Sequence, residues 1–227
     1  MRHLHYTFQF GVVFDELAYL LGGAVITLEI AFLSFWLGSL IGLGGATAKL
    51  RGGRVLRAIT NAYVVFFTNT PALVQIFFLF YALPDIGILL NPFAAVVIGM
   101  TINTGAYMTD ILRGGILSVR QAEIESAEVL GMSHLQTLRY VILPHVAKTL
   151  FAPLSNFFIW LVLGSSMAAI FGVEELTGRA INISTQNLRT IETFIVVAGI
   201  YILLTVIASA ALALIGRWAF RVRARIF

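Results

Sequence analysis

The stretch FIVVAGIYILLTVIASAALALIGRW, from Phe194 to Trp218, contains a single charged side chain, that of Arg217. Written as a helix, it is longer than the roughly 20 residues needed to cross a hydrocarbon core of about 30 Å. The run is continuously apolar and lacks the two-residue alternation of a membrane β-strand. It therefore predicts a helix that crosses a lipid bilayer.

The composition of the whole chain agrees with this prediction. Of 227 residues, 59% are hydrophobic and only 11% are charged, and the mean hydropathy is +0.92. Soluble domains have about 45–50% apolar and about 25% charged residues. So few charges cannot cover a water-exposed globule of this size, and disorder would need the opposite composition. We predict an integral membrane protein.

Four further segments are long and apolar enough to cross the bilayer, which gives five predicted spans. The spans cover about 22–48, 58–83, 92–112, 150–171 and 194–218. No linker or change of composition separates them, so residues 1–227 are interpreted as a single all-α domain. Residues 1–16 are mixed in character and allow a short interfacial helix. No small-residue cleavage site is recognisable there, so we expect the first span to be retained as an anchor.

The positive residues orient the predicted spans. Twelve of the 15 Lys and Arg residues fall on one side, and the positive-inside rule makes that side cytoplasmic. The N-terminus is then outside and the C-terminus cytoplasmic. The twelve are Lys49, Arg51, Arg54, Arg57, Arg113, Arg120, Arg139, Lys148, Arg217, Arg221, Arg223 and Arg225, whereas Arg2, Arg179 and Arg189 lie on the other side.

Several function classes are disfavoured by residue content. The sequence pI of about 9.7 does not indicate nucleic-acid binding, because the positive residues lie in short loops and not on one polar face. Cysteine is absent, which excludes disulfides, thiolate metal sites and thiol catalysis. The four histidines share no ligand spacing, so no metal site is predicted.

The loop at 113–149 is the largest polar block of the chain. Helix formers fill residues 121–130, Gly131 stands where a helix ends, and Ser133 is typical of an N-cap. Two short helices at an angle are predicted, the second closed by Pro144, which we expect to end it. A membrane protein has little structural need for such a hairpin in water, which favours docking of a soluble partner.

This segment resembles the EAA signature of ABC-importer permeases. The signature reads Glu-Ala-Ala, three residues, Gly, nine residues, then Ile-x-Leu-Pro. Here it appears as Glu125-Ser126-Ala127, Gly131 and Val141-Ile142-Leu143-Pro144, with the spacing intact. Other motifs of the polar-amino-acid uptake branch follow in the expected order along nearly the whole chain. They are TNTPALVQ (68–75), NTGAY (103–107), RGGI (113–116), PLSN (153–156) and GVEEL (172–176).

The resemblance implies the type I ABC importer fold, with five transmembrane helices and a cytoplasmic two-helix coupling hairpin. It also implies a non-catalytic permease subunit in a bacterial inner membrane that contacts lipid and no nucleic acid. Its expected partners are ABC ATPase subunits, a second permease copy, an external solute-binding protein and a polar amino acid. No P-loop precedes the Lys148-Thr149 pair, so we expect ATP and Mg²⁺ to be bound by the ATPase, with no cofactor in this chain.

Two groups of candidate site residues follow from these motifs. The expected ATPase-coupling residues are Glu125, Ser126, Ala127, Gly131, Met132, Leu135 and Arg139, with Glu125, Ala127 and Gly131 at the centre of the contact. Polar residues inside spans are costly and often functional. The candidates for a translocation path are Asn69, Thr70, Asn103, Thr104, Asn156, Ser165 and Ser166, although each alone is more often a helix–helix contact.

Two carboxylates within the spans have structural explanations. Glu29 is expected at the membrane interface or in a buried hydrogen bond, and Asp110 is expected to pair with Arg113. The branch's "N-E-F-I" and "L-K-D-T-S-L" motifs lack their charges here, because the chain reads NFFI (156–159) and VLGSSM (162–167). Either a heterodimer partner keeps these charges, which we favour, or an external binding protein sets selectivity.

Two other functions remain open at this point. A secondary transporter or channel is disfavoured by the hairpin and by the lack of an inverted repeat. An intramembrane enzyme is disfavoured because no nucleophile–base set or metal constellation is recognisable. The sequence does not identify the amino acid.

Overall fold

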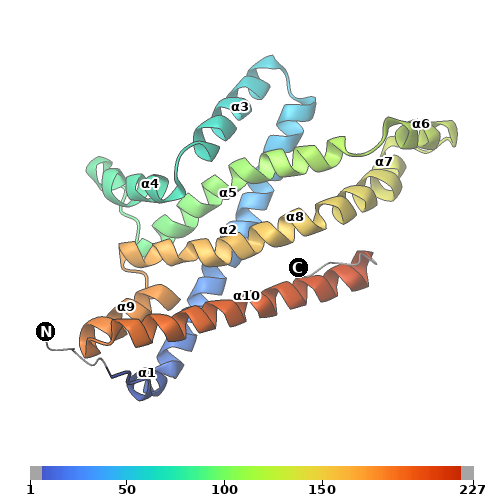
Figure 1. Ribbon diagram of the computed structural model, residues 1–227. Helices are drawn as coiled ribbons and strands as arrows, with labels where there is room; N and C mark the ends of the chain where they lie inside the picture. Colours follow the sequence, from blue (N-terminus) through green and yellow to red (C-terminus); the bar gives the residue numbers. More distant parts are fainter. Residues whose placement is uncertain (1–6, 221–227) are drawn as a thin grey trace, which may run out of the picture.

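The computed structural model describes residues 7–220, and the regular secondary structure of this part of the chain is entirely helical (Figure 1). The helices that the figure labels are α1 Gly11–Asp15, α2 Leu17–Arg51, α3 Arg54–Thr68, α4 Ala72–Phe77, α5 Pro92–Leu117, α6 Gln121–Val129, α7 His134–Thr137, α8 Leu143–Gly164, α9 Leu176–Asn187 and α10 Thr190–Phe220. Short π-helical or 3₁₀ turns extend them: η1 Phe78–Ala82, η2 Leu83–Ile86, η3 Leu138–Ile142 and η4 Ser165–Phe171. Arg2, His3, His5, Arg221, Arg223, Arg225 and the start of the expected interfacial helix lie outside the described residues.

The apolar spans expected from the sequence are present. Within residues 7–220, four helical runs are long and apolar enough to cross a membrane, at Leu17–Arg51, Pro92–Leu117, His134–Phe171 and Thr190–Ala219. The second predicted span is instead two helical segments, Arg54–Thr68 and Ala72–Ile86, which meet at a bend of 102°. The fold is therefore an all-α membrane architecture with a broken second span.

The long helices form a crossed arrangement. Helices α5, α8 and α10 run beside one another, and α2 crosses all three (Figure 1). The crossing of α2 with α5 is close because glycines of α2 face α5. A Cβ atom at Gly42 would lie 2.8 Å from the backbone carbon of Met108, and one at Gly45 would lie 2.9 Å from Thr109 Cγ2. Small residues thus let the two backbones approach, as in other membrane helix pairs.

The end of the predicted hairpin differs from the sequence expectation. Pro144 does not terminate a helix, because the chain is helical without interruption from His134 to Phe171. Proline lacks the amide hydrogen that would bond to the carbonyl four residues earlier. The π-helical turn η3 lies directly before Pro144 and changes that bonding pattern, which is a recognised way of accommodating such a defect. The hairpin is therefore joined rigidly to the fourth span.

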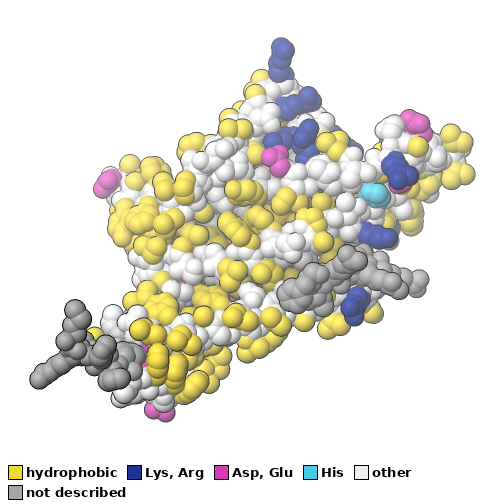
Figure 2. All heavy atoms as spheres, viewed as in Figure 1, with side chains coloured by type: hydrophobic (Ala, Val, Ile, Leu, Met, Phe, Trp, Pro, Cys, Tyr) yellow, Lys and Arg dark blue, Asp and Glu magenta, His cyan; other side chains and the backbone are white. Residues whose placement is uncertain are grey.

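The buried apolar residues gather in two clusters. One joins α2, α4, α5 and α8 around Ile30, Ile76 and Leu161, and the other joins α1, α2, α9 and α10 around Leu20, Leu176 and Val197. Both clusters draw on the half of the bundle that contains α1, α4 and α9, which we call the α9 end. The opposite end, formed by α6, α7 and the junction of α2 with α3, is called the hairpin end. In the view of Figure 2, the Lys and Arg side chains gather toward the hairpin end.

Candidate functional site

The hairpin is shaped by two adjacent caps. Gly131 adopts φ +73, and the amides of Gly131 and Met132 donate to the carbonyls of Glu128 and Ala127 at 2.9 and 3.0 Å. This pair of bonds is a Schellman motif, which ends α6. Ser133 then begins α7 in a reciprocal capping box with Gln136. The turn predicted from Gly131 and Ser133 is confirmed, and it sets the angle between the two helices.

The side chains of the hairpin separate into an inward and an outward set. Val129, Leu130 and Leu135 are 87%, 79% and 74% exposed, although all three are apolar. Ala127, by contrast, is buried and lines the hollow between the two helical segments of the hairpin. The position of Ala127 at the centre of a partner contact stays a prediction. Its small side chain lets the two segments of the hairpin pack together.

A hollow of about 520 Å³ lies between the two segments of the hairpin. Ser126, Met132 and Arg120 line it, together with Tyr140 and Val141 from the start of the long helix. Glu125, Gly131 and Arg139 are exposed, and Met132 is half-buried. The expected coupling residues are thus brought together on one projecting unit at the hairpin end (Figure 1).

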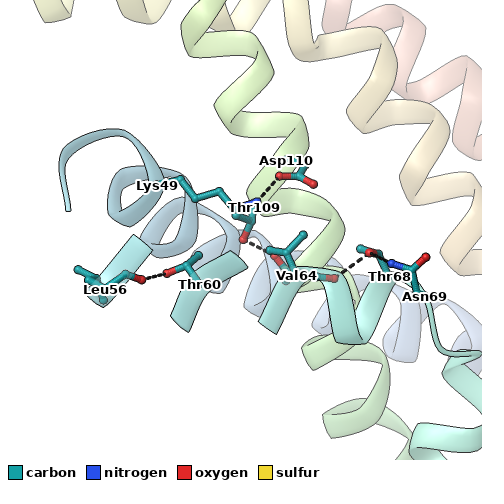
Figure 3. A network of polar contacts seen from close by, with 9 residues as sticks. Lys49, Leu56, Thr60, Val64, Thr68, Asn69, Thr109 and Asp110 are labelled. Carbon is teal, nitrogen blue, oxygen red and sulfur yellow. Dashed lines mark hydrogen bonds and ion pairs between the residues drawn. The ribbon is translucent and has the colours of Figure 1, made fainter. Parts of the chain in front are cut away.

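The break in the second span is the second candidate region. The bend and Pro71 leave backbone carbonyls at the end of α3 without helical amide donors, which inside a membrane must be satisfied by side chains. Thr70 Oγ1 donates to the Phe66 carbonyl at 2.9 Å, and Asn69 Nδ2 donates at 2.8 Å to the Val65 carbonyl, which also accepts from the Asn69 amide. Figure 3 shows Asn69 beside Thr68 at the end of α3. These two path candidates therefore also stabilise the break.

Side chains from α4 and α5 donate hydrogen bonds to further backbone carbonyls at the break. Gln75 Nε2 donates to the carbonyls of Phe67 and Thr70 at 3.1 and 3.0 Å, and Asn103 Nδ2 of α5 donates to that of Phe67 at 2.9 Å. Tyr107 Oη reaches the Thr68 carbonyl at 3.3 Å. Sequence reasoning missed Gln75, and only its place within a quoted motif marked it. The break is thus a built structure that ties α3, α4 and α5 together.

The remaining path candidates do not form one lining. Thr104 is fully buried against α2, where it faces Gly38. Ser165 is also fully buried and donates to the Val162 carbonyl at 2.8 Å. Asn156 is exposed and Ser166 half-buried on the fourth span. In this arrangement Asn69, Thr70, Asn156 and Ser166 retain accessible surface, Asn103 and Thr104 contact other helices, and Ser165 bonds within its own helical run.

A buried carboxylate joins three helices, α2, α9 and α10, at the α9 end. Glu175 is fully buried, and its Oε1 accepts from the Gly178 amide at 2.9 Å, so it caps α9. Its Oε2 accepts from Thr27 Oγ1 of α2 and from Tyr201 Oη of α10, both at 3.0 Å. We call these four residues the Glu175 knot. In the sequence, Glu175 was marked only as part of the GVEEL motif. That motif indicated the family but not that Glu175 is the buried acceptor of the knot.

Next to the knot, Arg179 of α9 packs against Gly22 and Gly23 of α2. Its Nη1 donates to the Tyr19 carbonyl at 2.6 Å, and its guanidinium carbon lies 4.5 Å from the centre of the Tyr19 ring. A Cβ atom at Gly23 would lie 2.8 Å from Arg179 Cδ, so a larger residue there would displace the side chain. Arg179 Nε also donates to the Glu174 carbonyl at 3.0 Å, so the arginine connects α9 to α2 through backbone carbonyls.

Asp110 and Glu29, the two carboxylates within the predicted spans, differ in whether they have a charged partner among the described residues. Asp110 Oδ1 lies 2.8 Å from Lys49 Nζ, so the expected pairing with Arg113 is wrong (Figure 3). The C-terminal end of α2 approaches α5 closely and places Lys49 beside Asp110. Arg113 lies about one turn further along α5, the helix that carries Asp110 itself. Glu29 is exposed and lines a hollow of about 450 Å³ with Asn91, Phe93 and Glu174, which excludes the buried hydrogen bond.

Comparisons with known proteins support the motif assignments. Residues 34–221 match the family described as binding-protein-dependent transport system inner membrane component. The chain is 34% identical over 206 residues to the glutamine transport system permease protein GlnP of Escherichia coli strain K12, covering 89% of this chain and 93% of that protein. It is 39% identical over 170 residues to the L-cystine transport system permease protein TcyB of Bacillus subtilis strain 168, covering 75% and 73%.

A solved structure is similar over almost the whole fold. The crystal structure of an amino acid ABC transporter with histidines aligns with a TM-score of 0.86 and 31% identity, covering 93% of this chain and 99% of that one. The type I ABC importer fold expected from the sequence is thereby confirmed.

Proposed function

Because the chain belongs to the family of binding-protein-dependent transport system inner membrane components, we propose that it is the transmembrane permease subunit of an ATP-driven importer of polar amino acids. Relatives named for glutamine and L-cystine transport support the substrate class. A secondary transporter or channel does not fit this family. The chain is a transport subunit, and ATP with Mg²⁺ belongs to the separate ATPase.

The projecting hairpin is the observation that carries this proposal. Leu130 and Leu135 expose large apolar surfaces on either side of a rigid turn, and such surface is favourable only when a partner covers it. Glu125 and Arg139 provide exposed charges around it. The long helix that follows α7 is continuous with the fourth span, so force on the hairpin is transmitted directly into the membrane domain.

The rest of the assembly follows from the importer function. An external binding protein delivers the amino acid at the α9 end, and a second permease completes the translocation path. Phe157 and Leu163 stand where related permeases carry charges, which supports a heterodimer whose partner supplies them. Purification of the tagged chain from native membranes tests this point, because a second permease of similar length must copurify. An ATPase without a second permease would contradict the heterodimer.

We place the N-terminal side outside the membrane and the C-terminal side in the cytoplasm. The chain has no cysteine, so single cysteines report the orientation cleanly. Leu188 and Val129 are 83% and 87% exposed at opposite ends of the molecule. A membrane-impermeant maleimide is expected to label Leu188→Cys in intact cells and Val129→Cys only after permeabilisation. The reverse pattern would overturn the orientation.

The coupling role of the hairpin is tested at Gly131. Gly131→Arg forces a side chain into a left-handed conformation and adds a bulky cation on the docking surface, so uptake should fall at least about tenfold. Gly87→Arg is the matched control for loss of the copurifying ATPase, because Gly87 has φ +84 and open space around it but lies at the α9 end, away from the hairpin. Gly131→Asn, which tolerates the conformation, separates backbone strain from bulk. Normal uptake with Gly131→Arg would refute the assignment.

A further inference from the structure

The junction of α2 and α3 forms an exposed corner at the hairpin end. Helix α2 ends at Arg51, Gly52 and Gly53 turn the chain, and α3 begins at Arg54. The turn is held by the Gly52 amide, which donates to the Ala48 carbonyl at 2.9 Å. Arg57 Nη2 donates to the Gly52 carbonyl at 3.0 Å. The corner is therefore an ordered structure although nearly all its side chains are exposed.

Three cations of this corner carry uncompensated charge. Arg51, Arg54 and Arg57 are exposed, and no carboxylate in the described residues 7–220 lies within ion-pair distance of them. The acid that packs against this part of α2, Asp110, is engaged by Lys49 at 2.8 Å (Figure 3). Figure 2 shows dark blue side chains concentrated where α2 meets α3. The corner thus presents positive charge that an anionic partner would neutralise.

Apolar side chains flank the same arginines. Val55 and Ile59 are 73% and 62% exposed, and they lie four residues apart on one face of α3. Arg54 and Arg57 lie three residues apart on the adjacent face, so the first turns of α3 are amphipathic and basic. This pattern is typical of helices that lie at a membrane interface. A free phosphate or a polar protein surface would leave Val55 and Ile59 without a favourable environment.

We propose that the α2–α3 corner, residues 51–59, binds anionic phospholipid headgroups of the adjacent leaflet. The corner joins the ends of two membrane spans, which places it at the level of the headgroups. Arginine guanidinium groups pair with phosphate oxygens, while Val55 and Ile59 insert among the acyl chains. The inference rests on the proposed function only for making this leaflet the cytoplasmic one, where anionic lipids attract basic segments.

The test measures lipid retention by the purified full chain together with the subunits that copurify with it. The delipidated protein is titrated in mild detergent with phosphatidylglycerol or phosphatidylcholine, and bound lipids are counted by native mass spectrometry. The Arg51→Gln/Arg54→Gln variant is expected to lose preference for phosphatidylglycerol by about fivefold per arginine. Arg51→Lys/Arg54→Lys is the matched control, which keeps the charge and should keep most of the preference. Arg57 is left intact because it stabilises the turn.

Three outcomes would overturn the proposal. The first is unchanged phosphatidylglycerol retention by a monodisperse Gln variant with the same melting temperature as the Lys variant. The second is displacement of the lipid by millimolar inorganic phosphate, which would indicate a free-anion site. The third is loss of a copurifying subunit with lipid retention intact, which would indicate a protein contact. Lipid retention is measured without transport, so its failure is distinguishable from failure of the importer assignment.

Discussion

The α9 end and the hairpin end of this protein are stabilised in different ways. At the α9 end, Glu175 connects Thr27 and Tyr201, residues 148 and 26 positions away in the sequence, in a fully buried network. At the hairpin end, the turn at Gly131 is closed by local bonds, and Leu130 and Leu135 remain exposed. The first end is held by bonds between distant segments of the chain, whereas the second is held by local bonds and leaves large apolar side chains exposed.

This difference bears on how the transporter works. Alternating access requires some parts of the permease to stay rigid while others respond to the ATPase. The knot makes the α9 end the rigid part, because breaking it exposes several buried polar groups at once. The hairpin is continuous with the fourth span through the uninterrupted helical run His134–Phe171, so the two move together. We interpret it as the element that receives movement and the α9 end as the frame against which spans move.

The largest expected effect comes from removing the carboxylate of the knot. Glu175→Ala leaves Thr27, Tyr201 and the Gly178 amide buried without their acceptor, which should lower the free energy of unfolding by about 3–5 kcal/mol. Glu174→Ala is the matched control, because Glu174 is exposed and should change stability by less than about 0.5 kcal/mol. Unfolding in mild detergent measures both. Equal stability of the two variants would remove the contrast between the ends.

The next effect concerns the α2–α5 contact that joins the two ends. Gly42→Leu places a side chain against the Met108 backbone and should destabilise the protein by about 1–3 kcal/mol. Gly44→Leu, two residues along the same helix, meets nothing within 4 Å and should be nearly neutral. Thermal unfolding of the two variants compares them directly. A similar loss in both would show that close packing of α2 on α5 does not limit stability.

A smaller effect is expected for the ion pair at the hairpin end. Asp110 is 52% exposed and Lys49 only 11%, so solvent screening limits the pair to about 0.2–1 kcal/mol. Lys49→Asp and Asp110→Lys should each reduce stability slightly, and the double swap should restore most of the loss. A double-mutant cycle measures the coupling between the two residues. Absence of restoration would argue that the two positions act independently.

The smallest effect on stability is expected at the tip of the hairpin. Val129→Ser and Leu135→Ser remove exposed apolar groups, so the free energy of unfolding should change by less than about 0.5 kcal/mol. ATPase copurification should nevertheless fall, because the proposed contact loses its apolar surface. Ile181→Ser, at a similarly apolar but 41% exposed site of α9, is the control that should keep the ATPase. Full copurification with both tip variants would separate these residues from the proposed docking surface.

Several features were predictable because they depend on neighbouring residues in the chain. The apolar spans follow from hydropathy alone, and the hairpin turn follows from the local chemistry of Gly131 and Ser133. The second span was expected as one helix, whereas the chain breaks at Asn69-Thr70-Pro71 with a bend of 102°. Pro144 was misjudged, since a π-helical turn beside it allowed the helix to continue.

Other features required the tertiary structure. The partner of Asp110 depends on the crossing of α2 and α5, which places Lys49 closer than Arg113. The roles of Gln75 and Asn103 depend on where the freed carbonyls of α3 point. Polar residues within apolar spans look alike in sequence whether they line a path or join helices. Only the packing distinguished buried Thr104 and Ser165 from exposed Asn156.

The motifs of the sequence indicated a permease, and the sequence by itself determined a helical membrane protein with a capped hairpin and a strong charge asymmetry. These properties are set by hydropathy, helix capping and charge over short stretches of chain. The tertiary structure alone decided that Glu175 joins α2, α9 and α10 and that the α2–α3 corner leaves its arginines uncompensated. The physical reason is that these interactions depend on how distant helices cross, which a pattern of neighbouring residues does not specify.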